Sequence, residues 1–101
     1  MMNKEMKARL DQVQEFIRDS VEGIQIRGIP VGHIRIWMPL YFNKILMEHM
    51  VLSWGYMPEK MGVSIIDLYG VKVLEGYEHK VIVAHVDAVI FPMDPIVLQI
   101  S

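Results

Sequence analysis

His85 and Asp87 are the side chains best suited to chemistry in this sequence. Residues two apart point to the same face of a β-strand, so this imidazole and carboxylate can bind a divalent metal ion or form a hydrogen-bonded pair. A third metal ligand would have to come from elsewhere in the chain, and the spacing singles out none. The same two residues also fit an ordinary polar pair on a half-exposed strand. A metal-binding protein or small metal-dependent enzyme is therefore the alternative prediction.

Other groupings are less suited to catalysis. Glu75, Glu78 and His79 lie within five residues, but Gly76 favours a turn, whereas zinc-protease motifs place their ligands one turn apart on a helix. The chain has no cysteine, and none of its four serines lies in the Gly-x-Ser-x-Gly pattern of a nucleophile elbow. No glycine-rich phosphate loop precedes a Lys-Ser or Lys-Thr pair. The sequence therefore favours a protein that is not an enzyme and uses no cofactor.

Arg27, His33, Arg35 and Trp37 form the best candidate for a binding surface. If the chain makes two strands on either side of Pro30, these side chains share one face. Arginine and tryptophan are enriched at interface hot spots, where each supplies a large contact area together with directed polar atoms. An ordinary solvent-facing surface, with Trp37 covering the edge of the core, explains the same pattern. Weak nucleic-acid binding through Arg27, Arg35 and Trp37 is a third prediction.

The composition limits which classes of protein this chain fits. Its 101 residues suit one domain. Ten Lys and Arg against twelve Asp and Glu give a net charge of −2, without the basic excess that marks nucleic-acid binding. No apolar h-region follows the charged start, Met1 to Leu10, and charges interrupt the longest apolar stretch, Ile36 to Leu52. We expect a cytoplasmic protein with no signal peptide, no membrane contact and no nucleic acid as its main partner.

A first helix is predicted over residues 1–23. Its apolar residues recur every three or four positions, which places them on one stripe of a helix, and Gly23 is a natural stop. The stripe consists of Met6, Leu10, Val13, Ile17, Val21 and Ile24. We expect this amphipathic helix to pack on its own domain, and a seam between subunits is the alternative.

A hairpin is predicted after that helix. Residues Ile24–Gly28 and His33–Met38 both alternate with period two, and Pro30 and Gly32 between them favour a turn. The inward face would carry Ile24, Ile26, Ile34, Ile36 and Met38. The chain from 24 to 101 then reads as a strand–helix–strand meander.

A second helix is predicted from Leu40 to Trp54, between Pro39 and Gly55. Few of its side chains are polar, and a helix that is apolar nearly all round is buried on more than one side. In a chain of this size one sheet can hardly supply that burial, which predicts a homo-oligomer. Its interface would use Phe42, Leu46, Met47, Met50 and Trp54.

Strands are predicted for most of the remaining chain. Val63–Tyr69 and Val71–Leu74 form two short strands joined by a tight bend, and residues 56–62 form a loop. A long strand covers His79–Phe91, and an edge strand covers Ile96–Ile100. The predicted fold is a single α+β domain over residues 1–101, with two helices packed on a small, mainly antiparallel sheet.

Two segments resemble small uncharacterised proteins encoded in tailed-phage and prophage genomes. They are Ile34-Arg35-Ile36-Trp37-Met38-Pro39-Leu40-Tyr41 and, after a helix, Leu68-Tyr69-Gly70-Val71-Lys72-Val73. The resemblance covers the last two-thirds of the chain. It departs at Glu75-Gly76-Tyr77-Glu78, where such proteins have a proline-containing turn. It implies a phage-like origin and supplies no catalytic residues. The nearly all-apolar second helix separately predicts a non-catalytic interaction or self-assembly module, whose partners are a second copy of this chain and an unidentified protein.

Overall fold

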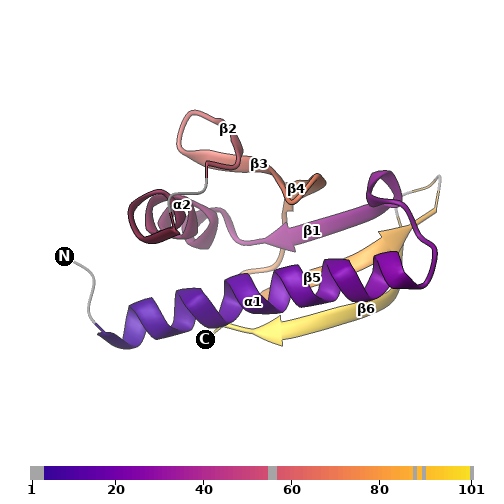
Figure 1. Cartoon of the computed structure of the whole chain (residues 1–101), viewed down its shortest axis with the longest axis horizontal. Coiled ribbons are helices and arrows are strands. Elements are labelled where there is room, and N and C mark those ends of the chain that lie inside the picture. Colours follow the sequence, from indigo (N-terminus) through magenta and orange to yellow (C-terminus); the bar gives the residue numbers. More distant parts are fainter. Residues whose placement is uncertain (1–3, 55–56, 88, 90, 101) are drawn as a thin grey trace.

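The computed structural model describes the backbone of residues 4–54, 57–87, 89 and 91–100, and their side chains except those of residues 53 and 54. Two helices lie against one face of a single six-stranded sheet (Figure 1). This arrangement confirms the predicted α+β class. The sheet is larger than predicted, and it is mixed because one pair of neighbouring strands is parallel.

The first helix, α1 (Lys4–Ile26), continues past the predicted stop at Gly23. The predicted apolar stripe is buried at Leu10, Val13, Ile17, Val21 and Ile24. Because Ile24 extends that stripe by one further step of three residues, residues 24–26 are helical and the predicted hairpin over 24–38 is wrong. The chain leaves the helical path at Gly28, whose φ of +91° favours glycine.

Replacing Gly23 with alanine is expected to raise the free energy of unfolding by about 0.5–1 kcal/mol. Gly23 lies inside α1, and a Cβ at this position would meet no other atom within 4 Å. Urea unfolding followed by circular dichroism measures the change. The control is Gly28→Ala, which should destabilise the protein because of its positive φ. A Gly23→Ala variant no more stable than wild type would contradict the expectation.

The strands lie in the spatial order β2-β3-β4-β1-β5-β6. Their bounds are Ile34–Met38 (β1), Glu59–Met61 (β2), Ser64–Leu68 (β3), Val71–Glu75 (β4), Lys80–Val86 (β5) and Pro92–Gln99 (β6). A 3-10 turn, η1 (Val31–His33), leads into β1. β1 pairs in parallel with β4 and antiparallel with β5, and the remaining neighbours are antiparallel.

Three strands differ in extent from the prediction. β2 occupies part of residues 56–62, which were expected to form a loop. β5 ends at Val86 rather than at Phe91, and β6 begins at Pro92 rather than at Ile96. β6 is an edge strand, as predicted, and prolines are tolerated there because an edge strand pairs on one side only.

The second helix, α2 (Leu40–His49), begins after Pro39 as predicted and continues as a π-helical turn, η2 (Met50–Trp54). It packs against α1 and β3. The predicted interface residues Phe42, Leu46, Met47 and Met50 are each at most 5% exposed. The chain itself therefore supplies the burial that predicted a homo-oligomer, and these four residues present no exposed surface to a second copy. The side chain of Trp54 lies outside the described residues.

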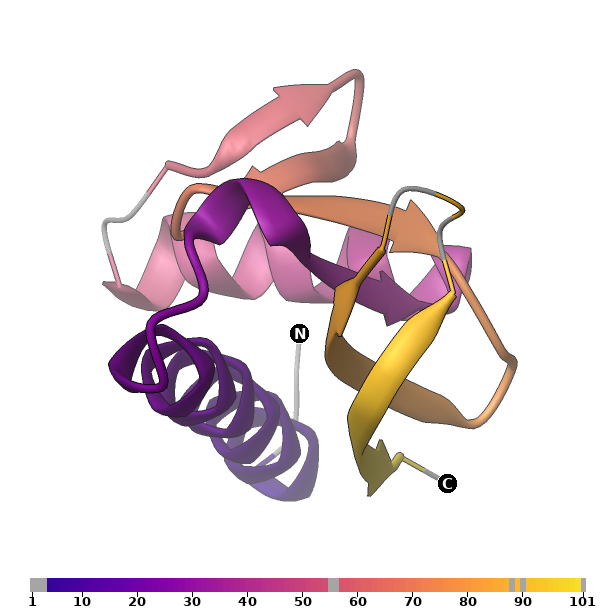
Figure 2. The same ribbon diagram turned by 90° about the vertical axis from the view of Figure 1, so that its right-hand side faces the viewer.

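The core lies between the sheet and the two helices. Figure 2 shows the sheet curving over both helices, while its outer face is covered by neither of them. β1 contributes Ile34, Ile36 and Met38 to the core, and all three are fully buried. The outer face of the sheet is therefore the surface on which exposed side chains can gather.

Candidate functional site

The outer face of the sheet carries two of the predicted binding residues. Successive side chains of a strand alternate between faces, so the burial of the core residues of β1 leaves Arg35 and Trp37 on the opposite side. Both are half-buried on a central strand, with β4 on one side and β5 on the other. We define the helix-free face as the surface that carries Arg35, Trp37 and the residues paired with them across the sheet.

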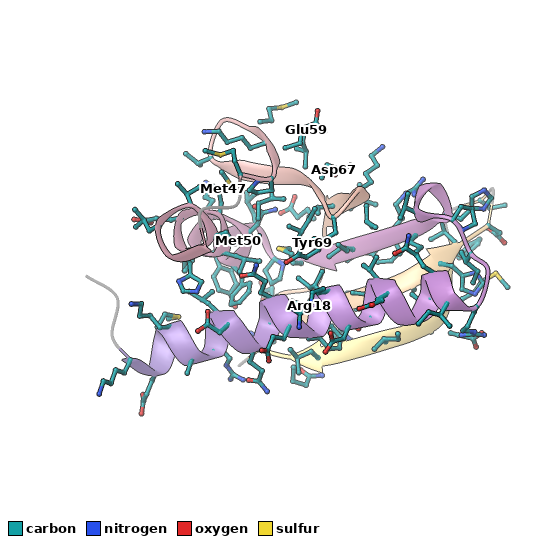
Figure 3. The ribbon with its side chains drawn as sticks, in the orientation of Figure 1. Arg18, Met47, Met50, Glu59, Asp67 and Tyr69 are labelled. Carbon is teal, nitrogen blue, oxygen red and sulfur yellow. The ribbon has the colours of Figure 1, made fainter. Side chains whose placement is uncertain are left out.

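A row of charged side chains crosses the helix-free face. Arg35 lies opposite Lys72 on β4, and Lys72 lies opposite Asp67 on β3. Asp67 in turn lies opposite Glu59 on β2, and Figure 3 labels both carboxylates on that hairpin. Directly opposite residues share a face of the sheet. The charged row therefore consists, in order, of Glu59, Asp67, Lys72 and Arg35.

The charged row is not neutralised within the chain. Across the described residues, no ion pair includes any of its four members. Arg35 instead donates hydrogen bonds of 2.8 Å from Nη1 to the carbonyl oxygens of Gly32 and Ile34, which hold its guanidinium near the start of β1. All four side chains are exposed or half-buried. Their charges are therefore available to a partner.

An apolar row runs beside the charged row, two residues further along β1. Trp37 lies opposite Leu74 on β4 and opposite Ile82 on β5. Ile82 in turn lies opposite Val97 on β6, which is exposed. A solvated sheet face normally carries polar residues at such positions. The helix-free face thus combines an apolar strip with a charged one.

A hollow of about 460 Å³ opens beside Trp37. Its lining residues are Trp37, Glu75, Gly76, Tyr77, Phe91 and Pro92. Tyr77 is 61% exposed and Phe91 is 64% exposed. The Lys80 ammonium lies 4.7 Å from the centre of the Tyr77 ring, within the range of a cation–π contact. An apolar side chain in this open hollow could contact the aromatic rings that line it.

Gly76 shapes this hollow by lacking a side chain. Its backbone N–H donates a 2.9 Å hydrogen bond to the carbonyl oxygen of Met38, which brings the backbone against Trp37. A Cβ on Gly76 would lie 2.7 Å from the Cβ of Trp37. Sequence reasoning treated this segment as a turn and missed Gly76, Tyr77 and Phe91. The available signals were Phe91 at the end of the predicted long strand and Tyr77 two residues before its start.

Two of the four predicted binding residues lie elsewhere. Arg27 follows the end of α1 rather than lying on a strand, and its Nη2 is 3.9 Å from Oδ2 of Asp94. His33 is exposed in η1. Of the four residues predicted to share a strand face, only Arg35 and Trp37 do so. Arg27 does not because the first strand of the predicted hairpin is helical, and His33 does not because the 3-10 turn precedes β1.

His85 and Asp87 contact different partners. β5 ends at Val86, and beyond it Oδ1 of Asp87 accepts a 2.8 Å hydrogen bond from the backbone N–H of Val89. His85 lies on the helix side of the sheet, with Nε2 4.0 Å from Oδ2 of Asp94. In the described part of the chain, no three or more His, Cys, Asp or Glu residues gather as a metal site would require. The geometry adds nothing in favour of the metal alternative.

Polar contacts on the other side of the sheet hold the helices in place. His49 is 2% exposed, and its Nε2 lies 2.7 Å from Oδ1 of Asp11, which joins α2 to α1. Gln14 donates a 3.0 Å hydrogen bond from Nε2 to the hydroxyl of Tyr69, which joins α1 to the turn between β3 and β4. These contacts fix both helices on one face and so leave the other face uncovered.

No family model, curated protein or solved structure matches this chain. Of the helices in the described residues, none combines the length and the apolar character needed to cross a membrane. On the helix-free face an aromatic hollow, an apolar row and a charged row lie side by side.

Proposed function

We propose that the protein is a non-catalytic protein-interaction module and that the helix-free face is its contact surface. The observation that carries this proposal is the position of Trp37 on a central strand of a sheet face that neither helix covers. The apolar row on either side of it is unusual for a face that meets only water. Ile82 is already buried within the chain, and a protein partner would cover the exposed parts of Trp37, Leu74 and Val97.

The residue types around Trp37 suit a protein interface. Tryptophan, tyrosine and arginine are the residues most enriched at interface hot spots, and Trp37, Tyr77 and Arg35 supply all three. The hollow of about 460 Å³ gives a partner side chain a place to insert. Hot-spot residues of one partner usually fill pockets of this kind in the other.

The resemblance of residues 34–41 and 68–73 to small phage-encoded proteins supports two roles for such a module. One role is the inhibition of a host factor, and the other is a part in virion assembly. Both roles require binding to another protein without chemistry, which is what the helix-free face supports.

Trp37→Ala is expected to weaken peptide binding to the helix-free face. A library of random peptides is selected for binding to the wild-type protein, and calorimetry measures the affinity of each selected peptide. We expect the Kd to rise at least about 30-fold in Trp37→Ala, because truncating a hot-spot tryptophan costs about 2 kcal/mol or more.

Leu52→Ala is the matched control for this experiment. Leu52 is a large apolar side chain on η2, 76% exposed and outside the helix-free face, so its truncation should leave the affinity unchanged. Selected peptides that bind wild type and Trp37→Ala equally would contradict the proposal. A single-stranded oligonucleotide that binds through Trp37, with an affinity that falls steeply with salt, would point to nucleic-acid binding instead.

A further inference from the structure

We infer that the partner of the helix-free face is a second copy of this chain, packed face to face about a two-fold axis. The inference rests on the proposed function, because it names the partner of the same surface. The axis runs along the strand direction, above the boundary between β3 and β4. The charged row identifies this partner.

The charged row is complementary to itself. From β2 to β1 its charges are negative, negative, positive and positive, and the sign changes between Asp67 and Lys72. A two-fold axis above that point reverses the strand order in the facing sheet. Asp67 then lies over Lys72 of the second copy, and Glu59 lies over Arg35 of the second copy. Each contact occurs twice, because both copies use the same surface.

The isolated chain holds like charges next to each other. Asp67 lies directly opposite Glu59, and Lys72 lies directly opposite Arg35. Like charges at directly opposite positions destabilise a sheet. A second copy placed about the two-fold axis brings an opposite charge to every member of the charged row. The pairing thus offsets the repulsion within these two like-charged pairs, which the opposite charges of Asp67 and Lys72, facing each other in the same chain, offset only in part.

The apolar row adds contact area to the same packing. Leu74 and Trp37 lie two residues along the strands from Lys72 and Arg35, so a sheet that covers the charged row also covers them. Packed sheets lie about 10 Å apart, with strand directions within about 30°. Apolar contact supplies affinity in such an interface, and complementary charges fix its orientation.

Size-exclusion chromatography with light scattering, at a series of concentrations in low salt, tests the inference. The wild-type mass should rise from the 11.7 kDa of one chain towards twice that value. Asp67→Lys and Lys72→Glu each place like charges over one another at two contacts. Each variant alone should therefore dimerise at least about tenfold more weakly, since like-charge contacts across an interface are strongly unfavourable.

An equimolar mixture of the two variants should dimerise again. In the mixed dimer the introduced lysine faces the introduced glutamate, and the unchanged Lys72 of one chain faces the unchanged Asp67 of the other. A variant that failed to fold could not be rescued in this way. The control is Lys7→Glu, which makes the same charge change on exposed α1, away from the charged row, and should leave the mass unchanged.

Three results would overturn the inference: a wild-type chain that stays at the mass of one copy throughout, single variants that dimerise like wild type, or a mixture that stays monomeric. The proposed function is tested separately. A monomeric chain that still binds peptides through Trp37 would remove the second copy as partner and keep the interaction surface. A chain that neither dimerises nor binds peptides through Trp37 would contradict both the second copy as partner and the interaction surface.

Discussion

Replacing Asn43 with alanine is expected to lower the free energy of unfolding by about 2–4 kcal/mol. Asn43 is a buried residue of α2, and its Nδ2 donates a 3.0 Å hydrogen bond to the carbonyl oxygen of Ile65 on β3. The backbone N–H of Ile65 donates a 2.6 Å hydrogen bond to Oδ1 of Asn43. Alanine removes both bonds and leaves buried polar groups of Ile65 short of partners. Small domains are stable by only about 5–15 kcal/mol, so this loss is large.

Urea unfolding followed by circular dichroism measures the effect of Asn43→Ala. The midpoint of thermal unfolding should fall by roughly 8–32 °C, given about 4–8 °C per kcal/mol for a domain of this size. Lys44→Ala is the matched control, since Lys44 is the next residue of α2 and its side chain is exposed. A loss of stability no greater than that of the control would show that the contact between Asn43 and β3 is not structural.

Replacing Gly76 with alanine is expected to lower the free energy of unfolding by about 1–3 kcal/mol and to displace Trp37. The added Cβ would lie 2.7 Å from the Cβ of Trp37 and 3.1 Å from the backbone nitrogen of Met38. Both of these atoms are backbone or the first side-chain atom, so they cannot rotate away. Either the hydrogen bond from Gly76 to Met38 breaks or Trp37 moves out of the hollow.

Two readouts separate these effects of Gly76→Ala. Urea unfolding gives the loss of stability, and the NMR shift of the Trp37 indole N–H reports the displacement of the ring. The control is Gly32→Ala, because a Cβ on Gly32 would meet no other atom within 4 Å. An unchanged indole shift and unchanged stability in Gly76→Ala would mean that the hollow does not depend on this glycine.

The helices and most strands are predictable from local patterns in the sequence. The apolar stripe from Leu10 to Ile24 follows from helical periodicity, and Pro39 correctly marks the start of α2. The end of α1 was misplaced because Gly23 is tolerated inside a helix, whereas Gly28 has the positive φ that ends one. The structure of residues 24–26 therefore follows the longer helical pattern and not the period-two alternation at residues 24–28.

The apolar circumference of α2 shows a limit of sequence periodicity. The pattern predicts that most sides of a helix are buried, but it does not say by which surface. Here α1 and β3 cover Phe42, Leu46 and Met50, so no second copy is needed for their burial. The burial of these three residues therefore reflects the core of the chain itself and is not evidence of self-association.

Only the β1 residues of the candidate site can be placed from the sequence alone. Alternation along β1 places Arg35 and Trp37 on one face without knowledge of the fold. The charged row as a whole does not follow from local patterns. Asp67 and Lys72 face each other across the predicted tight bend, but Arg35 joins them only through the pairing of β1 with β4, and Glu59 only through β2, which was predicted as a loop. That register depends on the parallel contact between β1 and β4, which joins segments more than 30 residues apart.

Backbone amide NMR spectra of the wild-type protein, recorded at increasing concentration, test the central claim most directly. If a second copy binds the helix-free face, the shifts that change should belong to β3, β4 and β1, with Asp67, Lys72 and Trp37 among them. The amides of the exposed side of α1, such as Lys7, should stay constant. Shifts that do not change with concentration, or that change on the helices instead, would contradict the account.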